Sequence, residues 1–385
     1  MGKKIIVGID ITDLKLSATG QKTVLAEIYL QLKKYQEDPV LCDRHLSNFK
    51  LLYFSSPFPI IKSRSKIALL SQHFFYHAWK QIILPLKAFF TGCNIVFCND
   101  YYVPYFHLRF KSVQFFYDAF FFENPEHYNK YWFILHKNVA MPAARKSSFI
   151  LTITNYSLQK IHFHTGIPLE KLVCIYLAPK SLEQVGANIN DPLLSSFIHT
   201  KYILHVGVME KRKNVITLIS AFNSLIQKGE KYNCFKLVLG GIGTGRLESD
   251  DTNNILALIK KLGLEDKIIL TGFLTDAQLK TAYENAFMYV FPSLNEGFGI
   301  PVLEAFKANI PVLVSNNSCL PEVGGEAVLT FNPLDSIEMA EKIQMVIDNP
   351  DLRNDLIIKG RERLNFFSWE KATLELLSVF KKTAQ

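Results

Sequence analysis

The chain has 385 residues, of which 49% are hydrophobic and 20% are charged. This length favours two domains, and the composition excludes a disordered or fibrous protein. The net charge of +8 is unevenly spread, because residues 1–180 hold 22 Lys and Arg against 11 Asp and Glu, whereas the remainder holds 21 against 24. A uniformly basic nucleic-acid-binding protein would not need this division, so we expect no nucleic-acid partner. A basic half suits a phosphate-bearing partner or an anionic membrane surface.

Several features indicate a cytoplasmic protein. The apolar run at residues 5–9 is too short for the core of a signal peptide, and no small, cleavage-like residues follow it. No apolar stretch approaches the roughly 20 residues that a membrane-spanning helix needs. The six cysteines form no CxxC pair, which favours buried thiols in a reducing compartment.

Short strand-like runs alternate with amphipathic segments of helical length along the chain. We expect strands at residues 5–9, 95–98, 113–116, 149–153, 202–206, 235–239, 268–271, 288–291, 312–315 and 327–331. We expect helices at residues 214–228, 255–262, 276–285 and 336–348. This alternation predicts an α/β protein with parallel sheets covered by helices.

The rhythm of strands and helices is interrupted by a polar stretch that contains glycine, asparagine and proline. We therefore place a linker at residues 181–200, between a first domain at 1–180 and a second at 201–365. Each domain is expected to be doubly wound and Rossmann-like, with ligands at the carboxyl ends of its strands. A cleft between the domains is the expected binding site.

Residues 60–90 interleave five Lys and Arg residues with six aromatic residues. One interpretation is a segment that rests on an anionic membrane, where a lipid-linked acceptor is presented, so that the protein is peripheral on the inner membrane face. The other is a helix that packs its aromatic face into the first domain. Both stay open. His73 and His77 stand four positions apart, but no glutamate lies between them as in a zinc protease, so we expect no metal there.

A tight turn opens into a helix at residues 295–306, which read NEGFGIPVLEAF. Gly297 and Gly299 permit backbone conformations that other residues resist. Pro301 suits the first helical position, because its missing N–H is not needed there. The sequence therefore predicts a helix N-terminus with exposed amides at residues 298–300, a site that suits phosphate.

Two glutamates bracket this helix start. Glu296 is expected in the loop and Glu304 in the first helical turn, so one carboxylate lies on each side of the phosphate site. Carboxylates accept hydrogen bonds from hydroxyls, and this geometry favours a sugar nucleotide, with one glutamate for each of its sugars. The alternative is an ordinary helix start in which Glu304 only complements the dipole.

Three cations, Lys211, Arg212 and Lys213, lie between the strand at 202–206 and the next helix. At the carboxyl end of a strand they can pair with phosphates, and each such charged hydrogen bond is worth roughly 1.5–3 kcal/mol. The alternative is a solvated run of charges before a helix.

With these elements in this order, the chain resembles the family 4 glycosyltransferases of the GT-B fold, which are retaining enzymes that use nucleotide-activated sugars. The resemblance covers nearly the whole chain and rests on GIDITDLKLSATGQKTVLAEI, LTITNYSLQKIHFHTGIPLEKL, GVMEKRKN, TGFLTDAQLKTAYENA, PSLNEGFGIPVLEAF, LPEVGGEAVLTFNP and FSWEKA. The spaced glutamates are its specific signal. It implies two Rossmann-like domains that face each other across a cleft, with residues 366–385 packed back on the first, and it leans towards mannosyl- and rhamnosyl-type transferases of surface polysaccharides.

The resemblance also implies roles for individual residues. Glu296 corresponds to the glutamate that holds the transferred sugar, and Glu304 to the one that binds the ribose. Lys213 corresponds to the lysine on the diphosphate, and Arg212 supplies the second cation, which many relatives place directly after the preceding strand. The glycine loops and amides around the donor correspond to Gly20, Gly207, Phe298, Gly299 and Ile300.

One position departs from the family pattern. Relatives commonly carry His-Asp where this chain has Tyr117 and Asp118. A tyrosine hydroxyl can donate a hydrogen bond to a sugar oxygen but stays neutral near pH 7. Either full activity or the usual donor geometry is therefore in question, while Asp118 can still orient the acceptor or support the sugar.

These observations predict a retaining glycosyltransferase that moves a sugar from a nucleoside-diphosphate sugar to a glycan or lipid-linked acceptor. The two cations would replace a metal ion, so we expect no metal and no cofactor beyond the donor. Two alternatives stay open: a sugar-nucleotide epimerase or hydrolase on the same fold, and a catalytically silent sugar-nucleotide-binding protein. We make no prediction for the oligomeric state.

Overall fold

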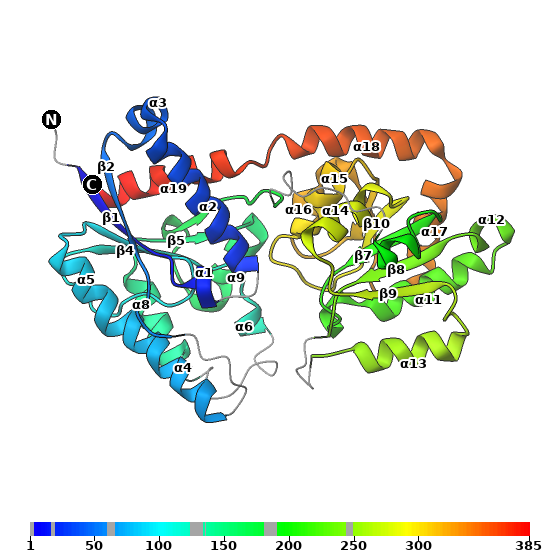
Figure 1. Cartoon of the computed structure of the whole chain (residues 1–385), viewed down its shortest axis with the longest axis horizontal. Helices are drawn as coiled ribbons and strands as arrows, with labels where there is room; N and C mark the ends of the chain where they lie inside the picture. Colours follow the sequence, from blue (N-terminus) through cyan, green and yellow to red (C-terminus); the bar gives the residue numbers. More distant parts are fainter. Residues whose placement is uncertain are drawn as a thin grey trace. The chain divides into compact units, whose positions relative to one another are not determined.

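The computed structural model describes residues 4–16, 20–59, 66–123, 134, 136–180, 191–243 and 249–385. The chain forms two compact units, an N-terminal unit of residues 1–177 with 368–385 and a C-terminal unit of residues 178–367 (Figure 1). Half of the expected linker, residues 181–190, lies outside the described residues. The other half belongs to the C-terminal unit and forms helix α10 (Pro192–Ser195), which the Asp191 carboxylate caps.

The N-terminal unit contains one sheet of six parallel strands in the order β2-β1-β3-β4-β5-β6. The strands are β1 (Ile5–Asp10), β2 (Phe49–Phe54), β3 (Ile95–Cys98), β4 (Lys111–Phe115), β5 (Phe149–Thr152) and β6 (Leu172–Cys174). From β1 the chain crosses first to β2 on one side and later to β3 on the other. The strand order therefore reverses between β1 and β3.

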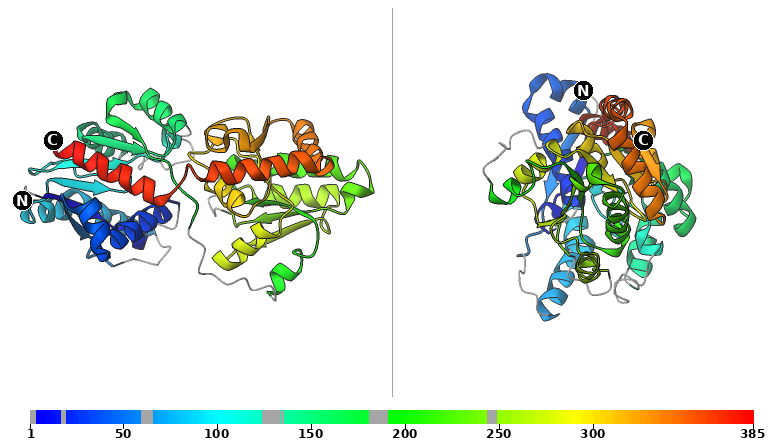
Figure 2. Two further views of the ribbon diagram at one scale, coloured as in Figure 1. Left: turned by 90° about the horizontal axis from the view of Figure 1, so that it is seen from above. Right: turned by 90° about the vertical axis from the view of Figure 1, so that its right-hand side faces the viewer.

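Helices cover both faces of this sheet, because the side chains of each strand alternate between the faces. On one face, Phe97 of β3 contacts Phe380 at 5.6 Å between ring centroids, which places the C-terminal helix against the sheet and beside α2 (Figure 2). On the other face, Val96 packs with Trp79 and Leu84. The helices of this unit are α1 (Asp13–Leu16), α2 (Gly20–Glu37), α3 (Pro39–Leu41), α4 (Lys66–Ala78), α5 (Leu84–Phe90), α6 (Phe120–Glu123), α8 (Met141–Lys146), α9 (Asn155–Thr165) and α19 (Trp369–Ala384), and a π-helical segment, η2 (Trp79–Ile83), joins α4 to α5.

The C-terminal unit contains a second sheet of six parallel strands, in the order β12-β11-β10-β7-β8-β9. The strands are β7 (Tyr202–Val206), β8 (Lys236–Gly240), β9 (Ile268–Gly272), β10 (Met288–Phe291), β11 (Val312–Ser315) and β12 (Val328–Phe331). The chain runs outward from β7 to β9, then returns to β10 on the opposite side of β7. This is the Rossmann order, and the reversal lies between β7 and β10.

Helices also cover both faces of the second sheet. Leu218 and Phe222 of α11 pack with Ile255 of α13 and Ile343 of α17 in one core. On another side α18 approaches α15 so closely that a Cβ added at Gly360 would lie 2.8 Å from Phe306. The helices are α11 (Val215–Ile226), α12 (Glu230–Asn233), α13 (Thr252–Leu262), α14 (Asp276–Glu284), α15 (Ile300–Lys307), α16 (Leu320–Gly324), α17 (Ser336–Asp348) and α18 (Pro350–Leu364).

The predicted α/β class with parallel, doubly wound sheets is confirmed. Every expected strand is present, with ends shifted by at most two residues. Strands β2 and β6 were not predicted. β2 reads FKLLYF and lacks regular alternation, and β6 is a three-residue edge strand, so neither carries the periodic pattern on which strand prediction depends.

Candidate functional site

The first candidate site lies where the strand order of the C-terminal unit reverses. β7 and β10 are hydrogen-bonded neighbours, with Ile203 opposite Met288. In open parallel sheets, the loops that leave two such strands diverge and open a crevice at their carboxyl ends. The loop after β7 ends in a 3-10 turn at Lys211–Lys213, and the loop after β10 leads to α15.

Hydrogen bonds tie these two loops together. The Leu294 amide donates to the Arg212 carbonyl at 2.8 Å, and the Arg212 guanidinium donates to the Asn295 carbonyl at 2.6 Å. The basic turn and the glutamate loop, 83 positions apart for Arg212 and Asn295, are thereby fixed side by side. The two elements therefore lie together at the carboxyl edge of this sheet.

Glu296 binds both predicted cations. Its Oε2 lies 2.9 Å from Nη1 of Arg212, and its Oε1 lies 2.6 Å from Nζ of Lys213. Arg212 also pairs with Glu210. Burial raises the pKa of Glu296, but the charges of Arg212 and Lys213 outweigh this and lower the pKa to about 2. The group is therefore a carboxylate at every physiological pH, and the four side chains together carry no net charge.

A histidine that sequence reasoning missed lies beneath this cluster. His205 of β7 is fully buried, with Nδ1 at 3.0 Å from the Val290 carbonyl. Burial lowers the pKa of His205 to about 4, so the neutral ring donates from Nδ1, and its Nε2 has no partner among the described residues. A Cβ at Gly207 would lie 3.4 Å from that Nε2 and 3.5 Å from Lys213. A histidine at an otherwise apolar strand position, in YILHV, was the available signal.

Helix α15 begins one residue earlier than predicted. Gly299 adopts φ 92° and ψ 51° before the helix, and Ile300 is its first residue, so Pro301 is second. A Cβ at Gly299 would also come within 2.9 Å of Leu320. Among the described residues, the Gly299 and Ile300 amides have no hydrogen-bond acceptor, whereas Phe298 is buried with its ring against Phe367 at 5.9 Å.

The earlier start corrects the position of Glu304. It is the fifth residue of α15 and lies in the second turn, not the first. Burial raises the pKa of Glu304 to about 6, against the opposing effects of the Tyr283 hydroxyl and the Lys180 charge. The two glutamates therefore differ in ionisation, because Glu296 faces two cations and Glu304 is buried without a comparable partner.

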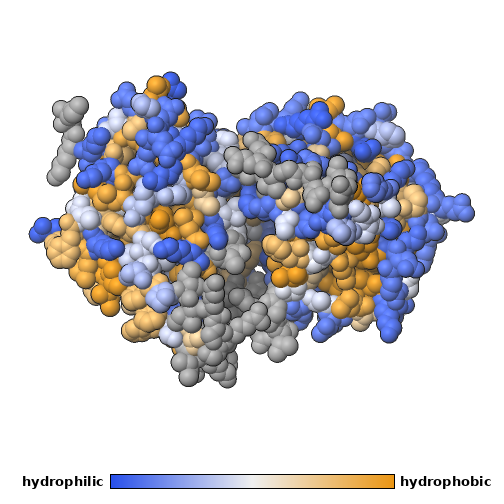
Figure 3. Space-filling model, in the orientation of Figure 1, coloured by the Kyte–Doolittle hydropathy of each residue, from blue (hydrophilic) through white to orange (hydrophobic). Residues whose placement is uncertain are grey.

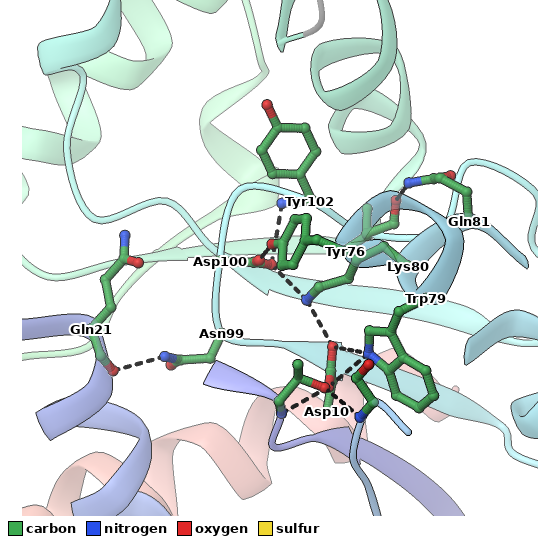
Figure 4. Close-up of polar contacts among 12 residues, drawn as sticks. Asp10, Gln21, Tyr76, Trp79, Lys80, Gln81, Asn99, Asp100 and Tyr102 are labelled. Carbon is green, nitrogen blue, oxygen red and sulfur yellow. Dashed lines mark hydrogen bonds and ion pairs between the residues drawn. The ribbon is translucent and has the colours of Figure 1, made fainter. Parts of the chain in front are cut away.

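A second polar cluster, at the strand reversal of the N-terminal unit, was not predicted (Figure 4). Lys80 of η2 is fully buried, and its Nζ lies 2.8 Å from Asp10 at the end of β1 and 2.9 Å from Asp100 after β3. The Trp79 indole donates to Asp10 at 3.1 Å, and the Tyr76 hydroxyl donates to Asp100. Burial lowers the pKa of Lys80, but the Asp10 carboxylate reverses this and holds it above its usual value.

The sequence was compared with protein-family models and with curated proteins, and both give matches to glycosyltransferases. Residues 196–363 match the family model "Glycosyl transferases group 1". Residues 196–363 form a group 1 glycosyltransferase domain. The chain is 28% identical over 286 residues to O-antigen chain mannosyltransferase B of Escherichia coli, covering 73% of this chain and 72% of that protein. It is 31% identical over 186 residues to serotype-specific mannosyltransferase WbdA of the same species, covering 48% of this chain but 22% of WbdA.

The fold of the whole chain matches solved glycosyltransferases. Sucrose-phosphate synthase from Thermosynechococcus elongatus superposes with a TM-score of 0.71 at 15% identity, over 98% of this chain and 99% of that one. This likeness confirms the predicted GT-B fold, and the family model with the curated relatives confirms a glycosyltransferase, whereas family 4 and retention stay predictions.

The glycosyltransferase holds the remaining predicted residues in its N-terminal unit. Tyr117 is buried, and its hydroxyl donates to Asn99 at 2.8 Å, while the Asn99 amide donates to the Gln21 carbonyl at 2.9 Å. Gln21 follows Gly20, the first residue of α2. Asp118 accepts hydrogen bonds from the Phe120 amide at 3.0 Å and the Tyr101 hydroxyl at 3.1 Å. Tyr117 is thus linked to the start of α2 through one asparagine.

In the described part of this glycosyltransferase, no three His, Cys, Asp or Glu side chains are grouped as metal ligands. In the same residue ranges, no helix has the length and apolarity to cross a membrane.

Proposed function

We propose that this glycosyltransferase belongs to the retaining family 4 enzymes and moves a sugar from a nucleoside-diphosphate sugar to a glycan or lipid-linked acceptor. Mannose is the first donor sugar to test, because the curated relatives described above are named mannosyltransferases. Surface-polysaccharide synthesis is the corresponding process. A cytoplasmic location remains part of the proposal.

The observation that carries the proposal is the pairing of Glu296 with both Arg212 and Lys213 beside the start of α15. Two cations and the Gly299 and Ile300 amides suit a diphosphate. A carboxylate has about four acceptor positions, so Glu296 can keep both cations in place and still accept hydrogen bonds from sugar hydroxyls. Its low pKa keeps it in the accepting form.

The same groups would assist departure of the leaving group. As the bond between the anomeric carbon and the phosphate oxygen breaks, negative charge grows on the diphosphate, and Arg212 and Lys213 stabilise it. Such prearranged charge is a large contribution to catalysis. The acceptor oxygen then bonds to the same face of the sugar, and its proton passes to the leaving phosphate. Because these cations can serve the role of a metal ion, we propose that the reaction needs none.

Glu304 and Gly207 complete the proposed donor site. The Glu304 carboxylate would accept hydrogen bonds from the ribose, and Gly207 would leave room for a phosphate beside Lys213. In the N-terminal unit, we assign Gly20 to the diphosphate of the donor, Tyr117 to the sugar, and Asp118 to the acceptor or the sugar, on the strength of the family resemblance alone.

Product analysis tests this proposal. Purified enzyme is incubated with a panel of isotope-labelled nucleoside-diphosphate sugars and a set of glycan and lipid-linked acceptors, with and without EDTA. We expect one donor to give a glycosylated product whose new bond keeps the donor's anomeric configuration by NMR, with an equal rate in EDTA.

Other outcomes would contradict specific parts of the proposal. Free sugar or an isomerised nucleotide sugar without acceptor identifies a hydrolase or an epimerase. Donor binding without any turnover identifies a silent binding protein, and recovery of activity in Tyr117→His would attribute the silence to that residue. An inverted product, or loss of activity in EDTA, overturns retention or metal independence respectively.

A further inference from the structure

The segment formed by α4, η2 and α5 has two different faces. Its inner face is fully committed to the N-terminal unit: Trp79 and Lys80 are buried and bind Asp10, and Leu84 lies in the core against β3. Of the six aromatic residues in this stretch, Phe74, Phe89 and Phe90 are exposed and do not pack into this core. Packing into the domain therefore describes the inner side of this segment, and contact with a membrane remains a possible role for the outer side only.

The outer face carries an apolar stripe. Its members are large, solvent-exposed and mostly four or eight positions apart, which places them along one side of a helix. They are Leu70, Phe74, Ile82, Leu86, Phe89 and Phe90. Phe74 is 69% exposed and Phe90 is 80% exposed. Six such side chains on one helical segment differ from the scattered single exposures that are normal on a protein surface. Hydrophobic side chains gather over this region in the space-filling view (Figure 3).

Cations border the stripe. The Arg109 guanidinium lies 5.5 Å from the ring centroid of Phe89, and the same loop exposes Phe106 and Leu108. Lys87 is exposed on α5 itself. The loop and the helix therefore form one surface in which aromatic rings stand next to positive charges.

Acidic residues are almost missing from this part of the sequence. Between Asp43 and Asp118 the chain has nine Lys and Arg residues and a single carboxylate, Asp100. Asp100 is buried and bound to Lys80, so it does not neutralise the surface. An apolar stripe with basic flanks and no acidic residue is the pattern of a helix that lies in the interface of an anionic bilayer.

We propose that this outer face of α4, η2 and α5, the stripe with its flanking cations, docks on an anionic lipid bilayer. Charge favours lipid over a second copy of the chain, because a symmetric self-contact would bring two like-charged surfaces together. The further step, that docking delivers the enzyme to a lipid-linked acceptor, rests on the proposed function. The docking itself does not.

Co-sedimentation with vesicles tests the proposal on the full chain. The protein binds phosphatidylcholine vesicles that contain phosphatidylglycerol, binds pure phosphatidylcholine weakly, and is released by high salt. Phe74→Ser combined with Phe90→Ser lowers the partition coefficient at least about tenfold for each ring removed. Lys87→Glu combined with Arg109→Glu lowers it about tenfold and removes the preference for phosphatidylglycerol.

Phe163→Ser is the matched control, because Phe163 of α9 is also 80% exposed in the N-terminal unit but lies outside the stripe. It should leave vesicle binding unchanged, and circular dichroism should show all variants folded. Equal loss in the control and the stripe variant would overturn the proposal, as would equal binding to both vesicle types.

A different outcome would assign the stripe to contact with a second copy of the chain. In that case the parent protein is a dimer that does not bind vesicles, and the Phe74→Ser, Phe90→Ser variant is a monomer. Transfer to a water-soluble acceptor should stay normal in the stripe variant. Failure of vesicle binding and failure of transfer are therefore read in separate assays.

Discussion

The two strand reversals of this protein have the same architecture and opposite chemistry. In the C-terminal unit, two cations and a helix start meet one shared carboxylate, Glu296. In the N-terminal unit, a single buried cation, Lys80, holds two carboxylates, and the nearby Asp13 has an Oδ2 without a partner among the described residues. Burial raises the pKa of Asp13, and the charge of Lys80 opposes this only in part.

The order of the strands therefore determines where a site lies in each unit, whereas the residues that follow the strands determine which ligand it can bind. At the reversal between β7 and β10, two cations and the amides at the start of α15 surround a single carboxylate, which suits an anion. At the reversal between β1 and β3, the one cation is bound by two carboxylates, so it is not available to an anion. The most informative experiments are those that perturb equivalent positions in the two units.

The largest expected effect is on stability, at Lys80. Lys80→Met leaves Asp10 and Asp100 buried without their cation, and breaking a buried pair in this way costs about 3–5 kcal/mol. Urea denaturation should show a transition of the N-terminal unit at much lower denaturant. Lys87→Met removes an exposed ammonium that lies 5.5 Å from the ring centroid of Trp79, and it should cost no more than about 1 kcal/mol. Equal midpoints for the two variants would mean that the Lys80 cluster is not a structural element.

The next effect is on catalysis, at the opposite reversal. Glu296→Gln leaves Arg212 and Lys213 without their shared carboxylate and removes the proposed contact with the transferred sugar. We expect kcat to fall by about 10²–10³, the range for loss of one prearranged charged contact. Glu210→Gln, which removes only a partner of Arg212, is the control and should cost less than about tenfold. A larger loss in Glu210→Gln would reverse the assigned roles.

A smaller effect, of about tenfold, is expected from pH. The Glu304 pKa is raised to about 6, so its carboxylate is mostly protonated at pH 5 and mostly ionised at pH 7. Because the ionised form accepts ribose hydroxyls, donor affinity should rise with pH across this window, and Glu304→Gln should flatten the profile. Stability should move the other way: the raised pKa favours folding below the ordinary value near 4.5, and this contribution is lost as pH rises through about 6.

Much of the fold could be predicted because its strands are short, buried and separated by amphipathic helices. The pattern failed at β2 and β6, where irregular or very short runs are strands only because neighbours pair with them. It also placed Glu304 in the first turn of α15 instead of the second, because the left-handed conformation of Gly299 starts the helix at Ile300, one residue before the predicted start.

The proposed donor site was predictable in outline, since cations and glutamates near strand ends carry a local signal. The Asp10, Lys80 and Asp100 cluster was not, because it joins residues from two strands and a helix, up to 90 positions apart in the sequence. Each residue alone is an ordinary charge. Only the strand order, with β1 beside β3, reveals that they meet.

The central claim is that the reversal between β7 and β10 binds a diphosphate, and calorimetric titration with a panel of nucleoside diphosphates tests it most directly. The parent, Lys213→Gln and Lys211→Gln are compared, because Lys211 is an exposed lysine of the same turn. We expect that one nucleotide binds, that Lys213→Gln weakens its binding by at least about tenfold, and that Lys211→Gln leaves its binding unchanged. Equal affinities for all three proteins, or no binding of any nucleoside diphosphate, would contradict it.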